Sequence, residues 1–198
     1  AEDLMALARS ALGQAELPRR FPLAPTCLAI ASRSVNTAQP LGLVLEHHYP
    51  WCRPWADELQ RLLADYARRK QQLRLLDFDD LLLAWAEALQ VPAVAQALSA
   101  RFDHVLVDEA QDCNRLQARI LDGMQPDGRG LTLVGDDDQA IYGFRGADRH
   151  VMLDMAQRPG TTVVALTQSY RATPELVSMA NALIAGAAQR LPRQLVSC

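Results

Sequence analysis

A single lysine, Lys70, occurs among the 198 residues of the chain. Lysine is the residue with which a phosphate-binding loop, G-x-x-x-x-G-K-[ST], reaches the β- and γ-phosphates of a nucleotide. Lys70 lies in the sequence YARRKQ, and no glycine is near it. The sequence therefore excludes a loop of this kind within these 198 residues.

Paired cysteines, long apolar runs and an excess of basic charge are missing too. The four cysteines, at positions 27, 52, 113 and 198, show no CxxC spacing, so we expect reduced thiols and a cytoplasmic protein. No apolar run approaches the roughly 18 residues that a membrane span needs. The net charge of -3 argues against a protein whose whole surface binds DNA, and the hydrophobic share of 49% predicts a folded chain.

The first hundred residues are predicted to be mainly helical. Apolar residues keep helical spacing near residues 4–11, along 55–73 and along 78–89. Asp77 is suited to cap the last of these helices. Its predicted buried face is Phe78, Leu81, Leu82, Trp85 and Leu89. Five prolines punctuate a poorly periodic segment up to about residue 52: Pro18, Pro22, Pro25, Pro40 and Pro50.

From about residue 101 the pattern alternates between strands and helices. Strands are predicted at residues 104–107, 131–134 and about 162–166. Helices are predicted at about 116–124 and 148–156 and from residue 173 onward, the last with Leu176, Met179, Ala180 and Leu183 as its apolar face. This order predicts βαβ units and a mostly parallel sheet, that is, an α/β fold.

Acidic residues follow the first two predicted strands directly. Asp108 and Glu109 end the first strand, and Asp136, Asp137 and Asp138 end the second. Residues 101–148 hold ten acidic residues against five arginines. Ligands of open α/β sheets bind outside the carboxyl ends of the strands, so we expect these acids to converge on one crevice that binds metal and phosphate.

The residue types at these strand ends suit phosphoryl transfer to water. Asp108 and Glu109 are adjacent and point in different directions, so one can hold Mg²⁺ while the other addresses a nucleophile. Gln139 offers an amide that can orient water or sense a terminal phosphate. Arg171, just past the third predicted strand, offers a cation for the charge that develops in the transition state.

Two further segments each leave two interpretations open. Residues 141–146 combine Tyr142, Phe144 and Arg145 with glycines, which is typical of single-stranded nucleic-acid binding, although either ring can instead cover the core. Residues 53–76 carry six basic residues against three acids. They fit a phosphate-binding helix and the solvated face of an amphipathic helix equally well.

Four segments resemble Rep/UvrD-type superfamily 1 DNA helicases. Residues 107–112, VDEAQD, resemble motif II of that family, and residues 134–147, VGDDDQAIYGFRGA, are similar to its motif III. Residues 168–173, QSYRAT, resemble motif IV, and residues 76–82, LDFDDLL, resemble the segment shortly before motif II. The resemblance covers about residues 76–185, and Phe144 and Ser169 stand where tryptophan and asparagine are common.

The resemblance implies a fold and an arrangement of domains. Residues 1–75 would be a mainly helical accessory region similar to the family's 1B subdomain. Residues 76–168 would form part of the first RecA-like motor domain, with a parallel sheet and flanking helices, and residues 169–198 would begin the second. We therefore expect the chain to be a piece of a longer helicase.

The resemblance also implies roles for single residues. Asp108 would ligate Mg²⁺ and Glu109 would activate the attacking water. Gln139 would sense the terminal phosphate of ATP, and Arg171 would contact it from the border with the second motor domain. Tyr142, Phe144 and Arg145 would contact single-stranded DNA.

The function implied is ATP-driven movement on single-stranded DNA in the 3′→5′ direction, with unwinding of duplex DNA and possible repair proteins as partners. A helicase–nuclease subunit and a non-catalytic DNA-binding module are the alternatives. Because the phosphate-binding loop is absent, we expect the 198-residue chain by itself to hydrolyse ATP at no more than background rate.

Overall fold

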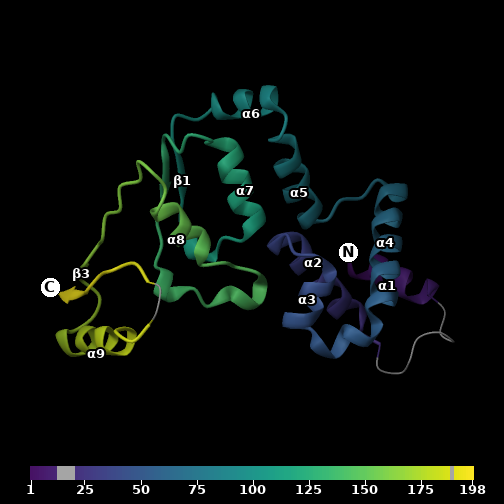
Figure 1. Ribbon diagram of the computed structural model, residues 1–198, viewed down its shortest axis with the longest axis horizontal. Coiled ribbons are helices and arrows are strands. Elements are labelled where there is room, and N and C mark those ends of the chain that lie inside the picture. The colour runs from purple at the N-terminus through teal and green to yellow at the C-terminus, as the bar shows by residue number, and fades with distance from the viewer. Residues whose placement is uncertain (13–20, 188–189) are drawn as a thin grey trace. The chain divides into compact units, whose positions relative to one another are not determined.

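The computed structural model describes residues 1–12, 21–187 and 190–198, apart from the side chain of Arg145. The chain forms two compact units (Figure 1). The first contains Ala1–Val105 and Asn114–Gly130, and the second contains Leu106–Cys113 and Leu131–Cys198.

The first unit is built from helices. They are α1 (Glu2–Ala11), α2 (Ala24–Thr37), α3 (Leu41–His48), the 3-10 helix η1 (Pro50–Trp55), α4 (Ala56–Leu73), α5 (Phe78–Ala88), α6 (Pro92–Ser99) and α7 (Arg115–Met124). The helices predicted at residues 4–11 and 55–73 are thereby confirmed as α1 and α4.

The prediction of a poorly periodic segment up to residue 52 is wrong, because α2 and α3 lie there. Pro25 occupies the first turn of α2 and Pro40 immediately precedes α3, positions at which proline loses no helical hydrogen bond. Pro18 lies outside the described residues. Proline at positions 25 and 40 starts a helix and does not interrupt one.

One apolar core joins α1, α2, α3, η1 and α4. Its fully or nearly fully buried members are Met5, Ala8, Phe21, Cys27, Ile30, Val44, Leu45, Cys52, Leu59, Leu62 and Tyr66. A second cluster joins α5 to α7 through Ala86, Leu89, Leu116, Ile120 and Met124. The two helices approach closely at Gly123, where a Cβ atom would lie 2.7 Å from that of Leu89. The helix predicted at about residues 116–124 is confirmed as α7, and its buried residues are Leu116, Ile120 and Met124.

The cap predicted for α5 is confirmed, but its predicted buried face is wrong in part. Asp77 and Asp80 form a capping box. Phe78 is 86% exposed, and Leu81 and Trp85 are exposed as well, whereas Ala86 and Leu89 are buried. Because α5 is apolar on most of its circumference, periodicity did not specify which side packs on α7.

No single described helix is both long and apolar enough to cross a membrane, and only α5 and α6 taken together, bent by 101°, reach that length and composition.

The second unit contains two short sheets and several helices. Its elements are β1 (Val105–Val107, which starts at the border of the unit), η2 (Ala110–Asp112), β2 (Leu131–Leu133), η3 (Asp137–Gln139), η4 (Tyr142–Arg145), α8 (His150–Ala156), β3 (Gln168–Ser169), α9 (Pro174–Ile184) and β4 (Val196–Ser197).

Both sheets are parallel pairs. In the first, the Val105 amide donates to the Gly130 carbonyl and the Val134 amide to the Val107 carbonyl, so both strands run in the same direction. In the second, Gln168 pairs with Val196 and Ser169 with Ser197. The strands predicted near residues 104–107 and 131–134 are confirmed as β1 and β2, although the apolar side chain of Leu106 in β1 is exposed.

The strand predicted at about residues 162–166 is wrong. These residues have no regular secondary structure, and Val163, Val164 and Leu166 are exposed. A β-branched apolar run forms a strand only where another strand supplies its hydrogen bonds. In this part of the chain the strand pairing occurs a few residues later, between β3 and β4. The coarse prediction of a helix-rich α/β chain with parallel strands therefore holds, whereas the single larger sheet is not formed by the described residues.

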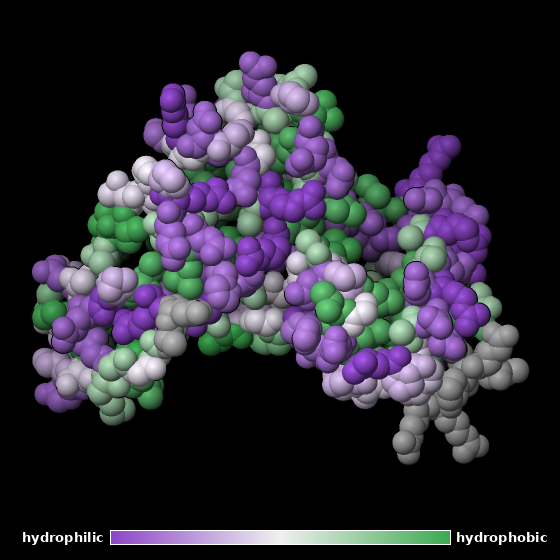
Figure 2. Space-filling model, in the orientation of Figure 1, coloured by the Kyte–Doolittle hydropathy of each residue, from purple (hydrophilic) through white to green (hydrophobic). Residues whose placement is uncertain are grey.

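The helices predicted at residues 148–156 and after residue 173 are confirmed as α8 and α9. The predicted apolar face of α9 is not buried: Leu176, Met179 and Leu183 are exposed, and Val177 is the buried residue. Figure 2 shows hydrophobic residues at the surface over α9.

Candidate functional site

The pairing of β1 with β2 places the two groups of strand-end residues beside each other. The Ala110 amide donates to the Val134 carbonyl at 2.9 Å, beyond the last residue of either strand. Asp108 and Glu109 follow β1, and Asp136 follows β2 by three residues. The backbone therefore holds the two segments together where both strands end, as the sequence predicted.

Glu109 has an unusual backbone conformation. Its φ of 50° and ψ of 45° lie in the left-handed region, which residues other than glycine seldom adopt. Two contacts hold it there: Asp108 Oδ1 accepts a hydrogen bond from the Glu109 amide at 3.0 Å, and Glu109 Oε2 accepts one from Gln111 Nε2 at 2.7 Å. Non-glycine residues in this region concentrate at functional sites, so the conformation supports a role for Glu109.

Gln111 connects the two strand ends. It is 2% exposed, and its Oε1 accepts a hydrogen bond from the Asp136 amide at 3.0 Å while its Nε2 donates to Glu109. Asp136 Oδ2 in turn accepts a hydrogen bond from Gln139 Nε2 at 2.9 Å. Glu109, Gln111, Asp136 and Gln139 are thus linked by consecutive hydrogen bonds.

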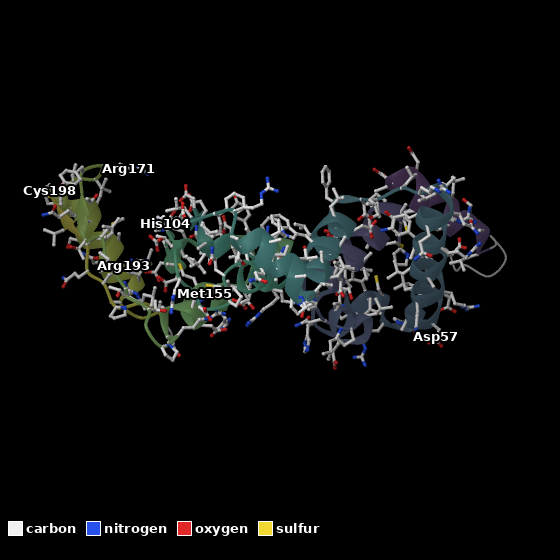
Figure 3. The ribbon with its side chains drawn as sticks, turned by 90° about the horizontal axis from the view of Figure 1, so that it is seen from above. Asp57, His104, Met155, Arg171, Arg193 and Cys198 are labelled. Carbon is white, nitrogen blue, oxygen red and sulfur yellow. The ribbon has the colours of Figure 1, made fainter. Side chains whose placement is uncertain are left out.

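The triplet Asp136, Asp137 and Asp138 is paired with arginines. Arg193, on the segment after α9 (Figure 3), donates to Asp137 Oδ1 at 2.6 Å and to Asp138 Oδ2 at 2.8 Å, and it also donates to Asp136. Arg190 lies 3.3 Å from Asp138. The carboxylates of the triplet lie within 4.8 Å of one another, a spacing that suits a cation, but guanidinium groups already neutralise them.

Asp137 shows the effect of this pairing on charge. Burial raises the pKa of Asp137, but the hydrogen bonds from Arg193 and from the Leu191 amide outweigh it and leave the pKa below its ordinary value of 3.8. Asp137 is 1% exposed. It is therefore a buried ionised carboxylate with a structural partner.

Asp108 is the strand-end acid that best fits a Mg²⁺ ligand. It is exposed, and the only hydrogen bond found for it within the described part of the chain uses Oδ1, which leaves Oδ2 for a ligand. Mg²⁺ in nucleotide sites is bound by one or two carboxylates together with phosphate oxygens and water. The donor set at Asp108 fits this pattern, whereas the arginine-paired triplet does not.

Arg171 follows β3 and is exposed, beside Cys198 in Figure 3. The hydrogen bonds that link Glu109 to Gln139 do not include it. The structure therefore brings together three of the predicted site residues, namely Asp108, Glu109 and Gln139, and does not join Arg171 to them by a described contact.

The aromatic segment after β2 presents one ring to solvent. Phe144 is 68% exposed, Tyr142 is half-buried, and their ring centroids lie 5.9 Å apart with the planes tilted by 53°. Gly146 ends the turn with φ of 93°. The side chain of Arg145 lies outside the described part of the structure. Exposure of Phe144 leaves its ring accessible for stacking with a base.

The basic residues of α4 are mostly engaged with acids. Arg69 lies 2.6 Å from Asp65, Arg68 also pairs with Asp65, and Lys70 lies 2.7 Å from both Asp77 and Asp80. Between the two interpretations of this helix, these contacts favour the amphipathic structural helix.

Comparison with known proteins decides the family. Residues 27–159, more than half of the chain, match the UvrD/REP helicase N-terminal domain. The chain belongs to the UvrD/Rep helicase family. The resemblance inferred from residues 76–185 is thereby confirmed, and the match extends it upstream into the helical unit.

Individual UvrD/Rep relatives align with a large part of the chain. ATP-dependent DNA helicase UvrD2 of Mycobacterium tuberculosis is 41% identical over 141 residues, which is 69% of this chain and 20% of the relative. DNA helicase II of Escherichia coli is 34% identical over 163 residues, 81% of this chain and 23% of the relative. The chain thus spans about a fifth of the length of these helicases.

Sequence reasoning missed two parts of this UvrD/Rep site. Gln111 belongs to the segment that resembles motif II, and its position two residues after Glu109 is the signal that could have identified its role. Arg190 and Arg193 were not singled out at all. Arg193 lies 56 residues beyond Asp137, and no local pattern indicates which acid an arginine will pair with at that separation.

Proposed function

We propose that this chain is part of an ATP-dependent DNA helicase and carries the water-activating side of its motor site. The observation that carries the proposal is the hydrogen-bonded series from Glu109 to Gln139, set beside the exposed carboxylate of Asp108. In this proposal residues 1–75 are a helical accessory region, residues 76–168 belong to the first motor domain and residues 169–198 begin the second.

Each residue has a separate task in hydrolysis. Glu109 accepts a proton from the attacking water, and Gln139 donates a hydrogen bond from its side-chain amide to an oxygen of the terminal phosphate of ATP. Asp108 would hold Mg²⁺, which when bound neutralises charge on the phosphate oxygens. Arg171 supplies a positive charge to the transition state once the second motor domain places it there.

Coupling to DNA follows from the position of the aromatic segment. Residues 139 and 142 are separated by only two residues, so a change in the position of Gln139 is transmitted over a short length of chain to Tyr142, Phe144 and Arg145. Exposed Phe144 supports stacking on a base of single-stranded DNA. Movement along DNA in the 3′→5′ direction and unwinding are proposed from the family.

The proposal is tested with Glu109→Gln in the full-length protein that carries this segment. Removal of a general base should lower the DNA-stimulated rate of ATP hydrolysis by about 100-fold or more, with binding of single-stranded DNA unchanged. Glu46→Gln, a change of the same type at an exposed position of α3, serves as the control and should leave both properties intact.

The alternatives give different results in the same experiment. A non-catalytic DNA-binding module would bind DNA but show no DNA-stimulated hydrolysis in the unsubstituted protein. A helicase–nuclease subunit would hydrolyse ATP and, in addition, cleave DNA when Mg²⁺ is present. Hydrolysis that persists in Glu109→Gln would overturn the assignment of Glu109.

A further inference from the structure

Gln111 makes two contacts that require the two different ends of an amide. Its Nε2 donates to Glu109 Oε2 at 2.7 Å, and its Oε1 accepts from the Asp136 amide at 3.0 Å. A carboxylate at this position lacks the donor, and a thioether lacks a strong group of either kind. Because the side chain is 2% exposed, water cannot readily replace a lost partner.

The surroundings of Gln111 hold its amide in place. A Cβ atom on Gly135 would lie 2.4 Å from Gln111 Oε1, closer than such atoms approach, and in tight contact at 3.0 Å from the Ala110 amide nitrogen. The glycine therefore lets the end of β2 lie directly against the amide. The backbone of residues 110–113 is also pinned by hydrogen bonds to Val134 and from Asp148.

The second contact of Gln111 leads to the proposed phosphate sensor. The Asp136 amide that donates to Gln111 belongs to the residue whose Oδ2 accepts from Gln139 Nε2 at 2.9 Å. A shift of Gln111 would therefore move the Glu109 carboxylate relative to the segment that bears Gln139.

We propose that Gln111 is a positioning residue that fixes the Glu109 carboxylate in register with Gln139 through the backbone of Asp136. The inference rests on the proposed function, in which Glu109 activates water. Gln111 touches neither nucleotide nor water in this scheme. Its effect on the reaction is exerted through the orientation of Glu109, so it should alter kcat and leave the KM for ATP nearly unchanged.

Two substitutions separate the two contacts of Gln111. Gln111→Glu keeps an acceptor for the Asp136 amide but removes the donor to Glu109 and adds a like charge beside it. Gln111→Met removes both contacts with little change of volume. In the full-length protein both variants should lower kcat by up to about 100-fold, which is the loss that an ångström-scale misplacement of a catalytic group causes. Gln111→Glu tests the contact to Glu109 separately from the contact to β2, since it retains an acceptor for the Asp136 amide.

A double-mutant cycle distinguishes positioning from general structural support. In the Glu109→Gln background, Gln111→Met should change the residual rate by no more than about twofold, because the group on which Gln111 acts is already gone. An equal loss of kcat from Gln111→Met in both backgrounds would overturn the inference. Unchanged hydrolysis in Glu109→Gln itself would instead refute the proposed function, so the two failures are distinguishable.

A spectroscopic measurement on the 198-residue chain tests the contact without turnover. The side-chain amide resonances of Gln111 in ¹H–¹⁵N NMR spectra should shift in Glu109→Ala and stay in place in the control Glu46→Ala. Resonances that do not respond to Glu109→Ala would show that the amide does not hold Glu109 in solution, and would overturn the proposal.

Discussion

The guanidinium of Arg193 donates a hydrogen bond of 2.6 Å to the carboxylate of Asp137, which is almost completely buried. This contact connects the segment after α9 to the end of β2, across 56 residues of chain. Removal of the arginine would leave a buried carboxylate without its main cationic partner. We expect Arg193→Met to destabilise the second unit by about 3 kcal/mol, measured by chemical denaturation.

The same pair predicts the pH dependence of stability. The pKa of Asp137 in the folded chain lies below its ordinary value of 3.8, so the stabilisation is complete above that value and is lost as pH falls through the lower pKa of the folded state. Arg193→Met should reduce the amount of stability that is lost on acidification, whereas Arg129→Met, at an exposed position, should leave that amount unchanged. An acid-unfolding profile that is the same in wild type and Arg193→Met would contradict the prediction.

Lys70, the sole lysine, lies where α4 meets the start of α5. Its Nζ is 2.7 Å from both Asp77 and Asp80, and Tyr66 donates to Asp77 at 2.9 Å. Burial raises the pKa of Asp77, but hydrogen bonds from Lys70, the Asp80 amide and Tyr66 lower it to about 2. We expect Lys70→Met to destabilise the first unit by about 2 kcal/mol at neutral pH.

For the Lys70 cluster the pH window lies between 3.8 and about 2, where Asp77 gains a proton in the unfolded chain before it does so in the folded chain. As the pH decreases through this window, the free energy of unfolding of the unsubstituted chain should decrease, and that of Lys70→Met should decrease less. Arg61→Met, which removes a longer surface ion pair of 3.7 Å, is the control and should cost well under 1 kcal/mol. Equal losses of stability in Lys70→Met and Arg61→Met would contradict a stabilising role for the cluster of Lys70, Asp77 and Asp80.

Gly135 is required by the close approach of Gln111. The Cβ atom of Gly135→Ala would meet Gln111 Oε1 at 2.4 Å, so the alanine should cost about 2 kcal/mol of stability and also reduce ATP hydrolysis by the full-length protein. Gly42→Ala is a matched control, because nothing lies within 4 Å of its Cβ position in α3. That control should be neutral or stabilising by less than about 1 kcal/mol in thermal melts.

The sequence predicted those parts of the fold that depend on neighbouring residues. The cap at Asp77, the buried stripe of α7 and the strand ends at Asp108 and Asp136 follow from local spacing. Contacts between distant residues were not predictable in this way. The pairing of Arg193 with Asp137 and the packed side of α5 depend on which segments meet in space, and periodicity carries no such information.

The site was predicted to a similar extent. Residue types at strand ends indicated Asp108, Glu109 and Gln139, whereas the double contact of Gln111 depends on the left-handed backbone of Glu109 and on the approach of Gly135. The pairing of Arg190 and Arg193 with the acidic triplet could not be predicted, because three consecutive aspartates can bind either a metal ion or a guanidinium group.

Phe144 is expected to contribute to DNA binding through stacking. Phe144→Ala in the full-length protein should weaken affinity for single-stranded DNA by about 10-fold, in keeping with the roughly 1–3 kcal/mol that a stacked base contributes. Phe144→Trp should retain or strengthen binding, since the larger ring covers more of the base. Phe102→Ala, which removes another exposed aromatic ring, should have no effect on fluorescence anisotropy with labelled DNA. Equal affinity of Phe144→Ala and wild type would exclude the stacking role.

The 198-residue chain by itself should neither hydrolyse ATP above background nor bind it tightly. It offers Asp108, Gln139 and Arg171 to the nucleotide but no phosphate-binding loop, because its one lysine has no glycine near it. That lysine, Lys70, is also paired with Asp77 and Asp80. Most of the charge on the triphosphate would remain unmatched, so calorimetry should show MgATP binding weaker than micromolar. Turnover by the pure chain that is stimulated by DNA and lost in Glu109→Gln would contradict this expectation, as would micromolar binding that survives Lys70→Met.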